Sequence, residues 1–180
     1  MHPRRARVWL WSALAVVLVA LLLAPVLYPL LWRLTHSTRF EQFGWQVQVP
    51  DGWYVVEHEP NLVLTRLPWF YPLRNAPANY IVLVENLLGA RISAELHWAR
   101  WREVSIQRER ASGLELVGER ELAAAGHLVR CLEFVAPGRT DRVRVECFHS
   151  RDVAAASYNG SRKYLNDFYD FLHMSANSDK

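Results

Sequence analysis

Seven histidines are the first candidates for chemistry, because imidazole binds metal ions and transfers protons near neutral pH. They are His2, His36, His58, His97, His127, His149 and His173. None of them stands in an HExxH or HxH arrangement, which are spacings that hold a metal ion. Ser150 and Asp152 follow His149, but the members of a catalytic triad converge from separate segments. We therefore interpret this trio as the end of a strand.

Other enzyme patterns are also missing from the sequence. It contains no glycine-rich phosphate loop and no nucleophile elbow. Glu57 and Glu59 share one side of an expected strand, and such a pair at a strand edge is usually solvated rather than a glycosidase pair. The sequence therefore predicts that the protein is not an enzyme, that it carries no cofactor and that it has no metal site.

The only two cysteines, Cys131 and Cys147, flank an expected turn over 137–141. A hairpin centred on Arg139 would place them directly opposite each other, within reach of a disulfide. A competing register, shifted by one residue, pairs the apolar side chains of the two strands and sends the cysteines to opposite faces. In that case they would be two small buried hydrophobic residues. Both alternatives are open at this stage.

Three consecutive aromatic residues lie between two prolines in the segment 67–73, which rules out a regular strand or helix interior. Such a segment either folds back over the sheet as a lid on the core or presents an apolar patch to a partner. Tryptophan and tyrosine are typical of binding hot spots. The candidate docking residues are Leu67, Trp69, Phe70, Tyr71 and Leu73.

A long apolar run over 8–32 predicts a single transmembrane helix, because about 20 helical residues cross a bilayer core of about 30 Å. The run is too long for a cleaved secretory signal. A basic head over 1–7 contains Arg4, Arg5 and Arg7, and by the positive-inside rule it lies in the cytoplasm. The aromatic residues expected at the two membrane interfaces are Trp9, Trp11, Tyr28 and Trp32.

The charge of the chain excludes an obvious nucleic-acid partner. The whole sequence has a net charge of +3 and a pI of about 9.1. Four of its 21 Lys+Arg residues flank the apolar run, which leaves 17 against 18 Asp+Glu in the rest. A domain with a net charge near −1 has no electrostatic footprint for nucleic acid. Only Lys163 and Lys180 are lysines, a ratio that favours a GC-rich bacterial genome.

The remaining sequence predicts a linker over 33–42, one α+β domain over 43–174 and a flexible tail over 175–180. Alternating apolar residues and turn signals predict strands on both sides of a central helix that Ser93 caps. Ala94, Trp98, Trp101 and Val104 form the expected buried stripe of that helix. The expected strands cover 43–49, 53–56, 62–67, 80–88, 114–122, 127–135, 141–149 and 153–158.

A last helix is expected after the turn Asn159-Gly160-Ser161. Its apolar residues recur at helical spacing and predict one buried face, with Asn166, Asp167 and Asp170 on the opposite side. The residues of the buried face are Tyr164, Leu165, Phe168, Phe171 and Leu172.

The strand Gly44–Val49 followed by Pro50-Asp51-Gly52-Trp53 resembles the start of PsbP-like domains. The later order of a central helix, antiparallel strands and an aromatic terminal helix is also similar to that family. The resemblance implies an antiparallel sheet between helices, an α-β-α sandwich, usually without catalysis. The family includes photosystem extrinsic subunits and DcrB-type bacterial lipoproteins. A transmembrane anchor departs from those soluble or lipidated members.

These observations predict a bacterial inner-membrane protein with a single span, a cytoplasmic N-terminus and a periplasmic domain. Its expected role is that of an accessory or stabilising subunit in a larger membrane complex of photosynthetic or respiratory type. Its expected partners are the bilayer and other membrane protein subunits. The alternative is a free-standing envelope protein that binds a small ligand or a stress-related partner.

Overall fold

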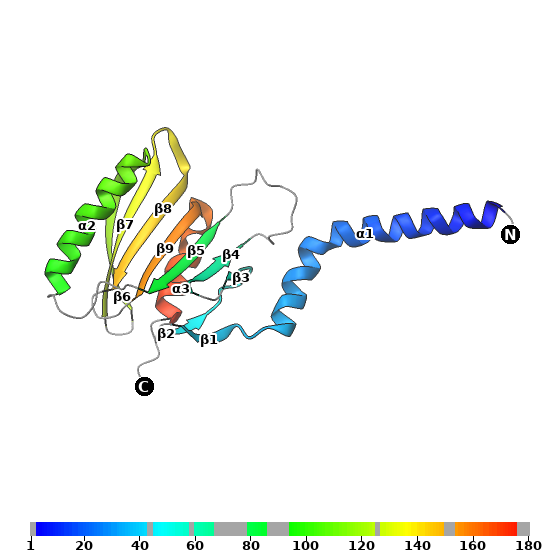
Figure 1. Cartoon of the computed structure of the whole chain (residues 1–180), viewed down its shortest axis with the longest axis horizontal. Coiled ribbons are helices and arrows are strands. Elements are labelled where there is room, and N and C mark those ends of the chain that lie inside the picture. Colours follow the sequence, from blue (N-terminus) through cyan, green and yellow to red (C-terminus); the bar gives the residue numbers. More distant parts are fainter. Residues whose placement is uncertain are drawn as a thin grey trace. The chain divides into compact units, whose positions relative to one another are not determined.

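The computed structural model describes residues 3–42, 45–57, 60–66, 79–85, 94–124, 127–149 and 154–175. The chain divides into two compact units, Met1–Ser37 and Thr38–Lys180 (Figure 1).

The first unit consists of one helix, α1 (Pro3–Thr35). Its described side chains over 11–23 are almost all exposed, among them Leu14, Val17 and Leu22 at 57%, 56% and 71%. At its C-terminal end the ring of His36 stacks on Trp32 with the ring centroids 5.0 Å apart. Within the described part of the chain, none of the helices combines the length and the apolarity that crossing a bilayer requires. The span predicted over 8–32 is therefore not confirmed.

The second unit begins with a small two-stranded sheet. Strand β1 (Arg39–Gln42) pairs antiparallel with β2 (Trp45–Gln48), so that Phe40 lies opposite Val47. Residues 39–42 were expected to belong to the linker. They form a strand because β2 offers them a ladder of backbone hydrogen bonds, which no pattern within four residues can reveal.

A seven-stranded antiparallel sheet forms the centre of this unit, in the order β3-β4-β5-β9-β8-β7-β6. The antiparallel strands before and after a central helix, α2 (Ala94–Ala111), match the order of elements expected along the sequence. The helix α3 (Leu165–Ser175) follows the last strand. The strands are β3 (Tyr54–Glu57), β4 (Leu62–Thr65), β5 (Tyr80–Glu85), β6 (Glu115–Ala124), β7 (His127–Ala136), β8 (Arg139–His149) and β9 (Ala154–Ser161).

One face of the sheet packs against α3 and forms the larger part of the core. Of the expected apolar face, Leu165, Phe168, Phe171 and Leu172 are buried there. Tyr164 is half-buried and lies in the helical turn before α3. Phe168 stacks on Tyr158 of β9, with the ring centroids 5.7 Å apart. Other sheet residues buried in this core include Leu62, Leu64, Ile81, Leu83, Val143, Val145 and Ala156.

The cysteines also lie in this core. Cys131 is paired directly with Cys147 across β7 and β8, and a disulfide joins them. The hairpin itself turns tightly at Pro137-Gly138, and an irregularity near Ala136 restores the register that places the cysteines opposite each other. Leu132 and Phe134 have the opposite parity and reach the other face, which α2 covers. The residues on both faces of β7 are apolar because this part of the sheet is covered on both sides.

The second face is covered by α2 over β6, β7 and β8 (Figure 1). Ile106 packs with Leu132 and Phe134, and Trp101 contacts Phe148 at a ring-centroid distance of 5.6 Å. Of the expected stripe, Trp98 and Trp101 pack against this cluster, Val104 was wrong because it is 54% exposed, and the side chain of Ala94 is not among those described. The buried positions are Ser105, Ile106 and Glu109, since the helix turns its 98–101–105–109 row toward the sheet.

The segment Asn159-Gly160-Ser161 was expected to be a helix-starting turn and instead completes β9. A Cβ atom on Gly160 would lie 2.5 Å from Oδ1 of Asn79, so the strand needs glycine at this close approach. The same Asn79 oxygen accepts a hydrogen bond from the Ser161 amide at 2.7 Å. The helical turn η1 (Arg162–Tyr164) then leads into α3.

Candidate functional site

The Pro50-Asp51-Gly52-Trp53 motif forms a turn between β2 and β3. The Trp53 amide donates a hydrogen bond to the Pro50 carbonyl at 3.2 Å. Gly52 has a φ of +80°, a conformation that residues with a Cβ rarely adopt. The turn delivers Trp53 into the core, where the residue is completely buried.

A polar network ties this turn to α3. The indole Nε1 of Trp53 donates to Oδ2 of Asp167 at 3.0 Å, and Arg66 forms an ion pair with the same carboxylate. The Arg66 guanidinium also lies over the ring of Tyr164, 4.0 Å from its centroid. A negative charge in the first turn of α3 is favoured by the helix dipole. The motif therefore acts as a structural clamp between the turn and the terminal helix.

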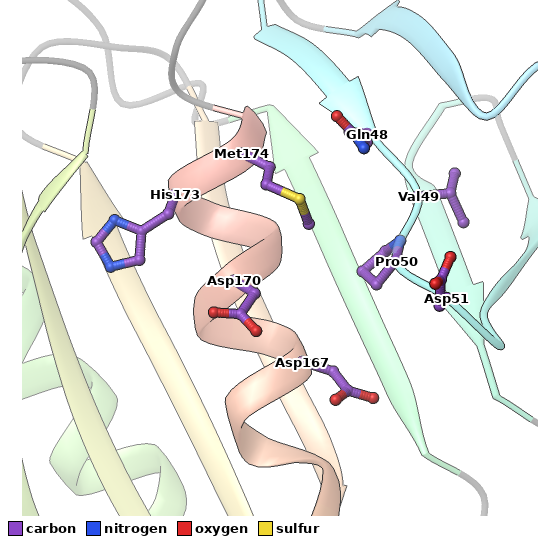
Figure 2. A pocket seen from close by; sticks show the side chains of 8 residues that line it. All are labelled: Gln48, Val49, Pro50, Asp51, Asp167, Asp170, His173 and Met174. Atoms are coloured by element: carbon purple, nitrogen blue, oxygen red, sulfur yellow. The ribbon is translucent and has the colours of Figure 1, made fainter.

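A cavity of about 440 Å³ opens beside this clamp, which is within the size range of small-ligand sites. It is formed by the 48–51 segment on one side and by the outer face of α3 on the other. In Figure 2, Asp167 and Met174 extend from α3 toward that segment. The residues that line the cavity are Gln48, Val49, Pro50, Asp51, Asp167, Asp170, His173 and Met174.

The chemistry that this cavity offers is hydrogen-bond acceptance by carboxylates. Asp51 and Asp170 are exposed, whereas Asp167 is already engaged by Arg66 and Trp53. Within the described ranges, no group of three His, Cys, Asp or Glu side chains is arranged to hold a metal ion. Neither cysteine is free, so no thiol is available as a nucleophile. The cavity is suited to weak binding of a polar or cationic molecule.

A second polar cluster joins α2 to β8. Glu109 and Glu146 are 1% and 5% exposed, and two arginines neutralise them. Nε of Arg108 lies 3.0 Å from Oε1 of Glu109, and Nε of Arg144 lies 3.2 Å from Oε2 of Glu109. Both arginines also pair with Glu146. Burial lowers the pKa of Arg108, but the two glutamates outweigh it and raise that pKa. The cluster fixes the C-terminal half of α2 to the sheet.

Two buried tyrosines complete the polar interior. The Tyr169 hydroxyl donates to Oε1 of Glu133 at 2.7 Å, and the Tyr158 hydroxyl donates to the Ser161 carbonyl at 2.6 Å. Burial raises the pKa of both phenols above their ordinary value, and the Glu133 hydrogen bond raises the pKa of Tyr169 further. Both phenols therefore act as neutral hydrogen-bond donors. Tyr158 positions the backbone at Ser161, and Tyr169 positions the side chain of Glu133.

The clamp predicts a clear stability effect. Replacing Asp167 with alanine leaves the buried Trp53 indole N–H without its acceptor, which costs about 2 kcal/mol of unfolding free energy. The ion pair with Arg66 adds little because both side chains are about 30% exposed. Urea unfolding measures the difference. Asp170→Ala, an exposed carboxylate of the same helix, is the matched control and should change stability by less than about 0.5 kcal/mol.

The raised pKa values of Tyr158 and Tyr169 predict that the folded protein loses stability at alkaline pH. A phenol whose folded pKa is raised stabilises fully below its unfolded pKa of about 10, and this stabilisation is lost as the pH rises through the folded pKa. Between pH 8 and pH 11 each such tyrosine should remove about 1.4 kcal/mol. Tyr169→Phe should be less stable at pH 8 but lose less between pH 8 and pH 11. Urea unfolding at both pH values measures the unfolding free energy. An equal loss between pH 8 and pH 11 in the wild-type protein and in Tyr169→Phe would contradict this assignment.

Some of the residues singled out by the sequence lie in the part of the chain that the structure describes, and others do not. Leu67, Trp69, Phe70, Tyr71 and Leu73 lie outside the described residues. Trp9 and Trp11 are 76% and 68% exposed on α1, whereas Trp32 is buried at 6%. The positions of Arg4, Arg5, Arg7 and Tyr28 fall within α1, and their side chains are not among those described.

Sequence reasoning missed the polar clusters. Arg66 and Asp167 are 101 residues apart, so no local pattern links them. The Pro50–Trp53 motif was the one available signal, because a buried tryptophan needs an acceptor for its N–H. Glu109 was missed because a charged residue beside arginines in a helix normally indicates a solvated face.

Comparisons with known proteins find similarity to solved structures only. No family model matches the chain. No curated protein matches it either. Among solved structures it is similar to cyanobacterial PsbP (CyanoP) from Synechocystis sp. PCC 6803, with 12% sequence identity and a TM-score of 0.46, over 76% of this chain and 89% of that chain. At this level of similarity the description of the fold rests on the chain's own strand order and registers.

Proposed function

We propose that this chain is a non-catalytic accessory subunit that is tethered to the bacterial inner membrane and stabilises a larger membrane protein complex. The N-terminus lies in the cytoplasm and the α+β domain lies in the periplasm. The complex is of photosynthetic or respiratory type.

The observation that carries this proposal is the apolar surface of α1. Its exposed large side chains include Leu18, Val19 and Leu21 at 59%, 52% and 66%. The side chains over 13–23 are all apolar and exposed, and an apolar helix surface is normally covered by lipid or by other apolar helices. A membrane with neighbouring subunits supplies both environments. Three arginines ahead of the run favour the cytoplasmic orientation of the N-terminus.

A non-catalytic role is supported by the partners of the described polar residues. Asp167, Glu109 and Glu146 hold arginines, and Glu133 accepts from Tyr169. Glu109, Glu146 and Glu133 connect α2 and α3 to the sheet. Asp167 also lines the cavity beside α3, but Arg66 and Trp53 already engage its carboxylate. A disulfide in the core fits an oxidising compartment such as the periplasm.

The docking segment is proposed from the sequence alone. Trp69, Phe70 and Tyr71 supply aromatic side chains, which are typical of interface hot spots. Leu67 and Leu73 flank them as aliphatic contacts. Replacing Trp69, Phe70 and Tyr71 with serine should release the partner subunits during purification in mild detergent. Asp51→Ser, at an exposed turn, is a control that should retain them.

A second candidate function is a free-standing envelope protein that binds a small ligand. The cavity of about 440 Å³ beside α3 favours it, because Asp51 and Asp170 are exposed acidic residues in its lining. A thermal-shift screen of small polar and cationic compounds distinguishes the two functions. Stabilisation that is lost in Asp170→Ala would favour ligand binding.

Protease accessibility tests the proposed topology. In intact spheroplasts, added protease should digest a C-terminal tag and leave a cytoplasmic marker protein whole. An N-terminal tag should be digested only after the membrane is opened. Protection of the C-terminal tag in intact spheroplasts would refute the periplasmic location of the domain.

A further inference from the structure

We draw no further inference here: the strongest candidate, the acidic cavity between the 48–51 segment and α3, belongs to the site already described, and its exposed carboxylates alone do not show which molecule would fill it.

Discussion

Replacing Leu18 and Leu22 with arginine is expected to move the protein from the membrane pellet into the soluble fraction. Both leucines lie on α1 and are 59% and 71% exposed. An arginine at the centre of a membrane helix costs about 2.5–3.5 kcal/mol on the insertion scale, so two together cost about 6 kcal/mol. Carbonate extraction followed by immunoblotting of both fractions measures the shift.

The matched control is Leu18→Ala with Leu22→Ala, which keeps the helix apolar and should stay in the pellet. A wild-type protein that is soluble without detergent would refute the tether. Retention of the double-arginine variant after carbonate treatment would also count against it, because two buried guanidinium groups should prevent stable insertion.

Removal of the disulfide is expected to cost about 3 kcal/mol of unfolding free energy. The bond closes a loop with a sequence separation of 16, and a loop of this length constrains the unfolded chain by about that amount. Replacing Cys131 and Cys147 with alanine should therefore lower the urea midpoint while the fold is kept. Alanine avoids placing a hydroxyl in the apolar core between the sheet and α3.

Reduction of the wild-type protein provides an independent route to the same state. Both cysteines are at most 1% exposed, so reductant should act slowly on the folded protein and quickly in urea. The reduced wild type should then unfold near the midpoint of the double-alanine variant. Equal stability of oxidised and reduced protein would show that the bond does not stabilise the domain.

Local patterns were enough to predict most strands and both helices of the domain. The i, i+3, i+7 spacing of Leu165, Phe168 and Leu172 marked the buried face of α3, and all three are buried. The alternation around Val47 marked β2. These features depend on neighbours a few residues apart, so sequence periodicity reports them directly.

Features that depend on distant residues could not be predicted in this way. The register of β7 on β8 was open because both faces of these strands are covered, so that Leu132 packs under α2 while Val145 packs under α3. The strand β1 and the Arg66–Asp167 pair also depend on contacts with remote segments.

Purification of the tagged full-length protein from native membranes in mild detergent tests the central claim most directly. Mass spectrometry of the eluate should find other membrane proteins in a fixed ratio to the tagged chain, and the ratio should persist through size-exclusion chromatography. The account predicts such a complex. A chain that elutes alone, still folded and with its disulfide intact, would contradict the accessory-subunit role and favour the ligand-binding alternative.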